Sequence, residues 1–104
     1  MKLMKSVLML VLIGVSTQAL ALECVALKNG EIQAQLQGNS SKSAVVDSYQ
    51  FDAIEVDANN LVLNIFDRRT PTSSAQAVIS GRVPGQIVAS QLETTDGSYQ
   101  VRCK

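Results

Sequence analysis

The feature that most constrains the fold of this chain is a short alternation of apolar and polar residues, interrupted repeatedly by turn-forming pairs. Because successive side chains of a β-strand point to opposite faces, a period of two predicts strands with one buried face. The pairs Asn29-Gly30, Asn59-Asn60 and Asp96-Gly97 each separate two such runs. Asparagine, aspartate and glycine favour the positive φ angles that two-residue hairpin turns require. The sequence therefore predicts three β-hairpins.

A two-residue turn fixes the register of its hairpin, because every pair of facing residues follows from the position of the turn. In the expected registers, the apolar residues of each hairpin share one face. In the first hairpin the expected pairs are Leu27 with Ile32, Val25 with Ala34, Ala26 with Gln33 and Lys28 with Glu31. In the second they are Val56 with Leu63, Ile54 with Ile65 and Glu55 with Asn64. In the third they are Leu92 with Val101 and Thr94 with Tyr99.

Two further segments, residues 43–50 and 75–80, have the composition of strands. Pro71 and the Val-Pro-Gly segment 83–85 predict loops or edge positions, because proline cannot donate to a strand ladder. No segment combines a helical apolar stripe with helix caps. We therefore expect an all-β fold, a small antiparallel sandwich or barrel of about six to eight short strands. The pattern does not distinguish the sandwich from the barrel.

The N-terminus has the three parts of a secretory signal peptide. Lys2 and Lys5 give a positive start, residues 7–15 an apolar centre, and Ala19 and Ala21 the small side chains of a cleavage site. The apolar centre is about 9 residues long, whereas a membrane-spanning helix needs about 20, so a retained membrane anchor is disfavoured. We expect a cleaved signal peptide of bacterial type.

The expected products are a signal peptide, residues 1–21, and a single β domain, residues 22–104. Glu23 precedes Cys24, in the place where a lipidated cysteine would need a small residue, so Cys24 is interpreted as a structural cysteine. The protein is expected in the periplasm or secreted from the cell.

Cys24 and Cys103 are the only cysteines, and they lie at the two ends of the expected mature chain. In an oxidising compartment such a pair predicts a disulfide. A domain of about 83 residues buries a modest share of its surface and benefits from a covalent link. Free thiols and an intermolecular pair are the alternatives. We expect an intramolecular bond that fastens the first strand to the last.

The charge of the mature chain argues against some partners. Seven basic and nine acidic residues lie in 22–104, a balance of about −2, and they are scattered. This is not the basic footprint of a nucleic-acid-binding protein, and no basic amphipathic helix for a membrane surface is present in the pattern. We expect no nucleic acid partner and no stable membrane insertion after cleavage; the oligomeric state stays open.

The sequence offers little catalytic chemistry. The chain contains no histidine, which removes Ser-His-Asp and Cys-His catalysis together with the commonest metal ligand. Asp52, Glu55 and Asp57 are the candidate carboxylates, with Glu55 and Asp57 expected on one strand face. No calcium-binding loop pattern surrounds them, so no metal site and no cofactor are expected. We predict that the protein is not an enzyme.

Arg68 and Arg69 form the candidate partner-binding loop. They lie in an Asp-Arg-Arg-Thr-Pro segment in which Pro71 stiffens the chain. An arginine there would present a planar donor to a carboxylate of a target protein. The alternative is a solvated connection in which Asp67 partly neutralises the arginines.

Three classes of function remain after these exclusions. The first is a small exported, non-catalytic binding or accessory protein, such as an inhibitor or a component of an envelope complex, with a protein partner in the cell envelope or outside the cell. The second is a structural or assembly protein that self-associates through strand edges. The third is a hydrolase that works through carboxylates. The absence of catalytic groups favours the first.

Overall fold

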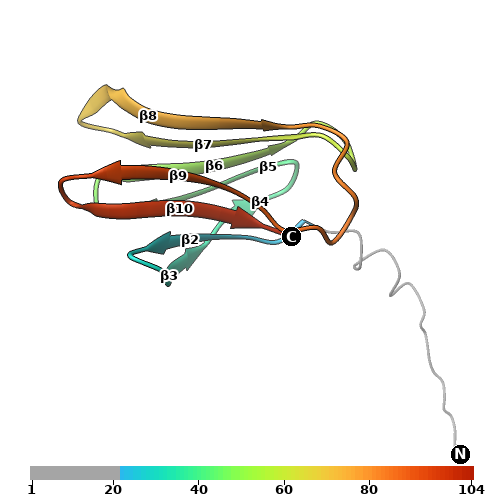
Figure 1. Cartoon of the computed structure of the whole chain (residues 1–104), viewed down its shortest axis with the longest axis horizontal. Helices are drawn as coiled ribbons and strands as arrows, with labels where there is room; N and C mark the ends of the chain where they lie inside the picture. The colour runs from blue at the N-terminus through green and yellow to red at the C-terminus, as the bar shows by residue number, and fades with distance from the viewer. Residues whose placement is uncertain (1–21) are drawn as a thin grey trace, which may run out of the picture.

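The computed structural model describes residues 22–104, and the expected signal peptide, residues 1–21, lies outside the described residues. Residues 22–104 form two antiparallel sheets of orders β3-β2-β10-β9 and β4-β5-β6-β7-β8 (Figure 1). The strands are β2 (Cys24–Lys28), β3 (Glu31–Gln35), β4 (Gln37–Gly38), β5 (Ser41–Val46), β6 (Tyr49–Glu55), β7 (Leu61–Asp67), β8 (Thr70–Ile79), β9 (Val88–Thr94) and β10 (Gly97–Cys103). Among residues 22–104 there is no helix with the length and apolar character that a membrane span requires.

The expected all-β antiparallel fold is confirmed, and the architecture is the sandwich rather than the barrel. Residues 22–104 form nine strands, so the expected number of six to eight is wrong. The two sheets remain separate and face each other across one core. The chain crosses from one sheet to the other at Leu36, whose side chain is buried and whose backbone N–H donates to the Cys24 carbonyl at 2.9 Å. The core residues alternate along β2, β6, β7 and β10, as a period of two requires. Its larger members on these strands are Tyr49, Phe51, Leu61, Leu63, Ile65, Tyr99 and Val101.

The first hairpin has the expected turn but a different register beyond it. Asn29 and Gly30 have φ angles of 53° and 86°, as a type I′ turn requires. Next to the turn, two of the expected pairs form, Lys28 with Glu31 and Leu27 with Ile32.

A β-bulge between Ala26 and Leu27 then shifts the pairing by one residue, so that Ala26 faces Ala34 and Val25 faces Gln35. The expected pairs of Val25 with Ala34 and Ala26 with Gln33 are therefore wrong. The extra residue of the bulge is Gln33 on β3, which has no partner on β2.

The second hairpin has a five-residue loop, 56–60, in place of the expected two-residue turn. The Asp57 carboxylate accepts bonds from the backbone N–H of Asn59 and the side chain of Asn60, and these bonds hold the wider loop. As a result Ala53 pairs with Leu63 and Ile54 with Val62. The expected pairs of Val56 with Leu63, Ile54 with Ile65 and Glu55 with Asn64 are wrong, and Val56 is exposed.

The third hairpin turns at Thr95-Asp96, one residue earlier than expected. The Thr94 hydroxyl accepts a bond from the Asp96 N–H at 3.0 Å and donates to the Gly97 carbonyl at 2.9 Å. Leu92 therefore pairs with Tyr99, and Thr94 with Gly97. The expected pairs are wrong by two positions, a shift that leaves each side chain on its predicted face.

The remaining strand predictions are confirmed in part. Segment 75–80 lies almost wholly within β8, and segment 83–85 lies in the loop before β9. Pro71 lies in β8, at the edge of its sheet, where a missing N–H is tolerated. Segment 43–50 is wrong as a single strand, because the chain turns at Asp47-Ser48 and Asp47 has a φ of 58°.

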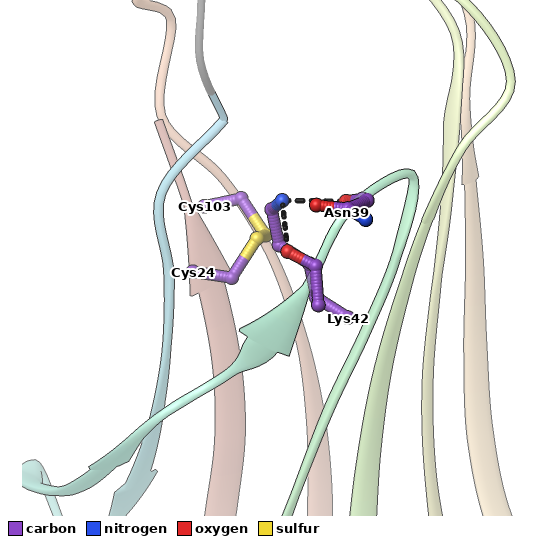
Figure 2. Close-up of a disulfide and its surroundings, with 5 residues drawn as sticks. Cys24, Asn39, Lys42 and Cys103 are labelled. Atoms are coloured by element: carbon purple, nitrogen blue, oxygen red, sulfur yellow. Dashed lines mark hydrogen bonds between the residues drawn. A yellow bond between two sulfur atoms is a disulfide. The ribbon is translucent and has the colours of Figure 1, made fainter. Parts of the chain in front are cut away.

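The predicted disulfide between Cys24 and Cys103 is present, and it joins β2 to β10, the first and last strands of residues 22–104 (Figure 2). Both cysteines are buried and face each other directly across the two strands. Figure 2 also shows the neighbouring β4–β5 hairpin, where the Lys42 ammonium donates to the carbonyls of Gly38 and Asn39 at 3.2 and 2.5 Å. A buried disulfide is consistent with folding in an oxidising compartment.

We expect the double variant Cys24→Ser, Cys103→Ser to unfold more easily than the oxidised protein. The bond spans 79 positions, and the chain-entropy treatment of such a loop gives about 4 kcal/mol of stabilisation. Urea unfolding of the two proteins, followed by circular dichroism, measures the difference. The reduced wild-type protein is the control and should match the variant. Equal unfolding midpoints for oxidised and reduced protein would contradict the prediction.

Candidate functional site

The candidate site lies at one end of the sandwich, which we call the turn end. It is formed by four hairpin turns, Asn29-Gly30, Asp47-Ser48, Arg68-Arg69 and Thr95-Asp96. The strand registers place them together, since Lys28 pairs with Tyr99 in one sheet and Tyr49 with Asp67 in the other. The disulfide and the C-terminus lie at the opposite end (Figure 1). The turn end is where charged side chains of both sheets meet.

Two stacked tyrosines form the floor of the turn end. Tyr49 comes from β6 and Tyr99 from β10, and their ring centroids are 4.1 Å apart. The Tyr49 hydroxyl donates to the Asp96 carboxylate at 2.9 Å, and the Tyr99 hydroxyl donates to the Asp47 carboxylate at 2.8 Å. Each tyrosine therefore bonds to a turn of the opposite sheet. This arrangement satisfies both buried hydroxyls and joins the two sheets.

Arg69 connects the β7–β8 turn to the β9–β10 turn. Its guanidinium donates two bonds to the Asp67 carboxylate, both at 3.0 Å, and a third to Asp96 at 2.8 Å. It also lies over the Tyr49 ring, 5.8 Å from the centroid. The side chain is still 58% exposed, so one edge of the group faces solvent. Arg69 is therefore engaged within the protein rather than free.

Arg68 differs from its neighbour. Its backbone N–H donates to the Ser48 carbonyl at 2.8 Å, which ties the β7–β8 turn to the β5–β6 turn. Its side chain is exposed and makes no hydrogen bond or ion pair to any other part of residues 22–104. The structure thus separates the two arginines that the sequence grouped: Arg69 belongs to an ion-pair network, and Arg68 points a free guanidinium outward.

Lys28 and Asp47 form a second ion pair at the turn end, with a distance of 2.9 Å. The bonds from Lys28 and Tyr99 hold the pKa of Asp47 below its usual value, while the bond to Asp47 raises the pKa of Lys28. Burial of the ring is the main reason that the pKa of Tyr99 is raised. The pair is therefore charged, and the tyrosine is neutral, at neutral pH.

An open cleft of about 550 Å³ adjoins this network, between the start of β8 and the end of β9. Its lining residues are Tyr49, Asp67, Arg69, Thr70, Ser73, Glu93, Thr94, Thr95 and Asp96. Hydroxyl and carboxylate groups dominate this list, so the cleft suits polar contacts. It lies beside the Arg68-Arg69 turn, which makes the two features one continuous surface.

The carboxylates of the cleft are all held in the ionised form. Arg69 lowers the pKa of both Asp67 and Asp96, with Tyr49 as the second cause at Asp96. Hydrogen bonds from Ser98 and Gln91 lower the pKa of Glu93. A general acid needs the opposite shift, a carboxyl that stays protonated near neutral pH. At neutral pH these three carboxylates can therefore accept hydrogen bonds and attract cations.

The carboxylates singled out in the sequence do not gather into a site. Glu55 ends β6, and Asp57 lies in the loop beyond it, so the expectation that they share a strand face is wrong. Asp57 instead holds its own loop through Asn59 and Asn60, which also lower its pKa. Asp52 accepts a bond from Gln50. Within residues 22–104 no three His, Cys, Asp or Glu side chains lie close enough to hold a metal ion together.

A buried arginine lies at the opposite end of the sandwich. Arg82 is 5% exposed, and its Nε has no hydrogen-bond partner in residues 22–104. Its backbone N–H donates to the Asn59 carbonyl and its own carbonyl accepts from the Asn59 side chain, both at 2.8 Å. These bonds join two loops, so the burial of Arg82 is maintained by loop packing rather than by an ion pair.

Sequence reasoning missed the tyrosine pairs and the carboxylates that complete the network. Tyr99 was expected only as the partner of Thr94 in a hairpin, and Asp47 and Tyr49 were placed inside one strand, 43–50. One signal was available: aspartate favours turns, and the hydroxyl of a buried tyrosine usually has a hydrogen-bond partner. The two partners are 52 positions apart for Tyr99 and Asp47, and only the pairing of the sheets brings them together.

Comparison with known proteins adds no relative: no family model, no curated protein and no solved structure matches the chain significantly.

We expect Tyr49→Phe and Tyr99→Phe each to lower the free energy of unfolding by about 1 kcal/mol, the usual value of one hydrogen bond. Each change keeps the stacked ring and removes only the hydroxyl that reaches the opposite sheet. Urea unfolding measures the effect. Thr72→Val, which removes an exposed hydroxyl from β8, is the control and should change little. Stabilities equal to the wild type for both phenylalanine variants would show that these bonds do not hold the sheets together.

We also expect stability to depend on pH only outside the neutral range. The pKa values of Asp47, Asp67 and Asp96 are lowered by folding, so their contribution is complete above the unfolded pKa of about 3.9 and is lost as the pH falls below it. The raised pKa values of Lys28 and Tyr99 produce a loss only as the pH rises above about 10.

Urea midpoints between acid and neutral pH measure this dependence. Arg69→Gln should reduce the acid-dependent loss, since Asp67 and Asp96 then return toward their ordinary pKa. Arg102→Gln, at the other end of β10, should leave the curve unchanged. An equal loss of stability at acid pH in Arg69→Gln and in the wild type would contradict the assignment of this loss to Asp67 and Asp96.

Proposed function

We propose that this protein is a non-catalytic binding or accessory protein, exported to the periplasm or outside the cell, that contacts a protein partner through its turn end. The observation that carries the proposal is the exposed guanidinium of Arg68, held on a turn whose other charges are already paired. The turn is fixed by its bond to Ser48 and by Arg69, so little conformational entropy is lost when Arg68 binds a target.

The exposed guanidinium of Arg68 indicates the chemistry of the partner. Arg68 offers a planar donor that matches a carboxylate of the partner, and the cleft beside it offers hydroxyls and ionised carboxylates. Such a surface suits a protein loop that carries an acidic side chain together with hydrogen-bond donors. The proposed location is supported by the disulfide and by the N-terminal signal pattern, which both favour an oxidising, extracytoplasmic compartment.

The hydrolase alternative has less support. A carboxylate-dependent hydrolase needs one carboxyl that remains protonated and one that is ionised. Asp67, Glu93 and Asp96 in the cleft all have lowered pKa values, and Asp57 is similarly shifted in its own loop. The self-associating alternative draws on a different surface, the free edge of β8.

The two arginines allow a sharp test of the proposed binding surface. We expect Arg68→Ala to lose the partner without loss of stability, and Arg69→Ala to lose stability because three bonds disappear. Arg102→Ala is the matched control, an exposed arginine at the far end of β10. The measurement is native mass spectrometry of the protein isolated from its host together with its bound proteins.

Two results would overturn the proposal. Retention of every complex by Arg68→Ala would show that the turn is not the binding surface. A wild-type protein that is recovered without any partner, under conditions that preserve known envelope complexes, would remove the binding function itself.

A further inference from the structure

β8 is a long, uncharged edge strand. It ends the order of the five-stranded sheet, so one side of its backbone has no strand partner within residues 22–104 (Figure 1). It is ten residues long, and residues 70–81 contain no charged side chain. Edge strands usually carry charges, prolines or bulges that prevent pairing with another chain. Here Pro71 provides such a block at the beginning of β8 only.

The hydrogen-bond pattern shows which backbone groups of β8 are free. The bond from the Arg68 N–H to the Ser48 carbonyl marks a hydrogen-bonded pair between β6 and β7, and such pairs alternate along an antiparallel ladder. It follows from the register that Ala75 and Ala77 bond to β7. Ser74, Gln76 and Val78 therefore direct their N–H and C=O groups toward the free edge, with their side chains exposed on the outer face.

The other sheet edges of residues 22–104 are less suited to pairing. β4 has two residues. β3 has five and begins with Glu31, and β9 carries Glu93 near its end. Charged side chains on an edge strand are among the features that prevent its pairing with another chain. β8 alone among these edges combines length with neutrality.

We propose that β8 is a self-association edge, which pairs antiparallel with β8 of a second copy around a two-fold axis. The net charge of the protein favours a second copy at this uncharged edge. Residues 22–104 carry a net charge of about −2, so two copies repel each other least where residues 70–81, which have no charged side chain, meet. A two-fold axis makes the contact isologous, and each copy then donates and accepts through the same residues, Ser74, Gln76 and Val78. The pairing extends the five-stranded sheet across both copies, and it does not rest on the proposed binding role of Arg68.

Sedimentation velocity of the exported, oxidised protein tests the pairing. We expect a monomer–dimer equilibrium in which the dimer fraction rises with concentration and predominates by about 1 mM. No larger species should form, because each copy has its β8 edge paired in the dimer. Gln76→Lys should weaken association at least about ten-fold, since two lysines then meet near the two-fold axis. Asn64→Lys is the matched control: Asn64 pairs with Gln76 on the same face but lies on the inner strand β7, so it adds the same charge away from the edge.

Amide hydrogen exchange gives an independent readout of the edge. The amides of Ser74, Gln76 and Val78 should become protected as concentration rises, whereas those of Ala75 and Ala77 should be protected at every concentration. A monomer throughout this range would overturn the proposal, as would equal weakening by Gln76→Lys and Asn64→Lys. Protection that appears only in a complex with a different protein would also overturn it, because the edge would then accept a foreign segment. Open-ended oligomers would mean that a second edge is used and would contradict the closed dimer.

Discussion

The stacked pair of Tyr49 and Tyr99 fixes the position of one sheet relative to the other. Each ring belongs to a different sheet, and each hydroxyl bonds to an aspartate in a turn of the sheet opposite its own. Sliding the sheets by one residue pair would separate the rings and leave two buried hydroxyls without acceptors, which costs more than the loss of two bonds in water. The apolar core alone tolerates more variation, because hydrophobic burial is not directional. The polar contacts therefore select one arrangement of the four turns.

The disulfide and the tyrosine pair act on different aspects of stability. The Cys24–Cys103 bond lies within one sheet, between neighbouring strands, so it does not hold the two sheets together. Its effect is mainly to restrict the unfolded chain. The tyrosine pair joins the sheets at the opposite end of the sandwich and acts only in the folded state. A small domain with a limited core thus has a covalent constraint at one end and a directional polar one at the other.

The sequence predicted the fold class and the disulfide because both depend on local pattern or on residue identity alone. Period-two alternation gave the strands, and two cysteines allow only one intramolecular pairing. Registers were predicted less well, because side chains altered the turns: Asp57 widens one loop and Thr94 moves another turn by one residue. The bulge at Ala26 left no signal in the sequence. The partner-binding role of the Arg68-Arg69 loop stays a prediction. The different contacts of the two arginines depend on Asp96, which lies 27 positions from Arg69.

The turn end and the β8 edge are distinct surfaces that begin at the same place, since β8 starts directly after the Arg68-Arg69 turn. Their charges differ: the turn end is rich in paired ions, whereas the edge has none. In an antiparallel pairing of two β8 strands, the strands run in opposite directions, so the two turn ends point away from each other. Self-association through β8 would then leave both copies of Arg68 accessible. A dimer of this geometry would present two identical binding surfaces at its ends, and a partner that engages both would bind more tightly than one copy allows.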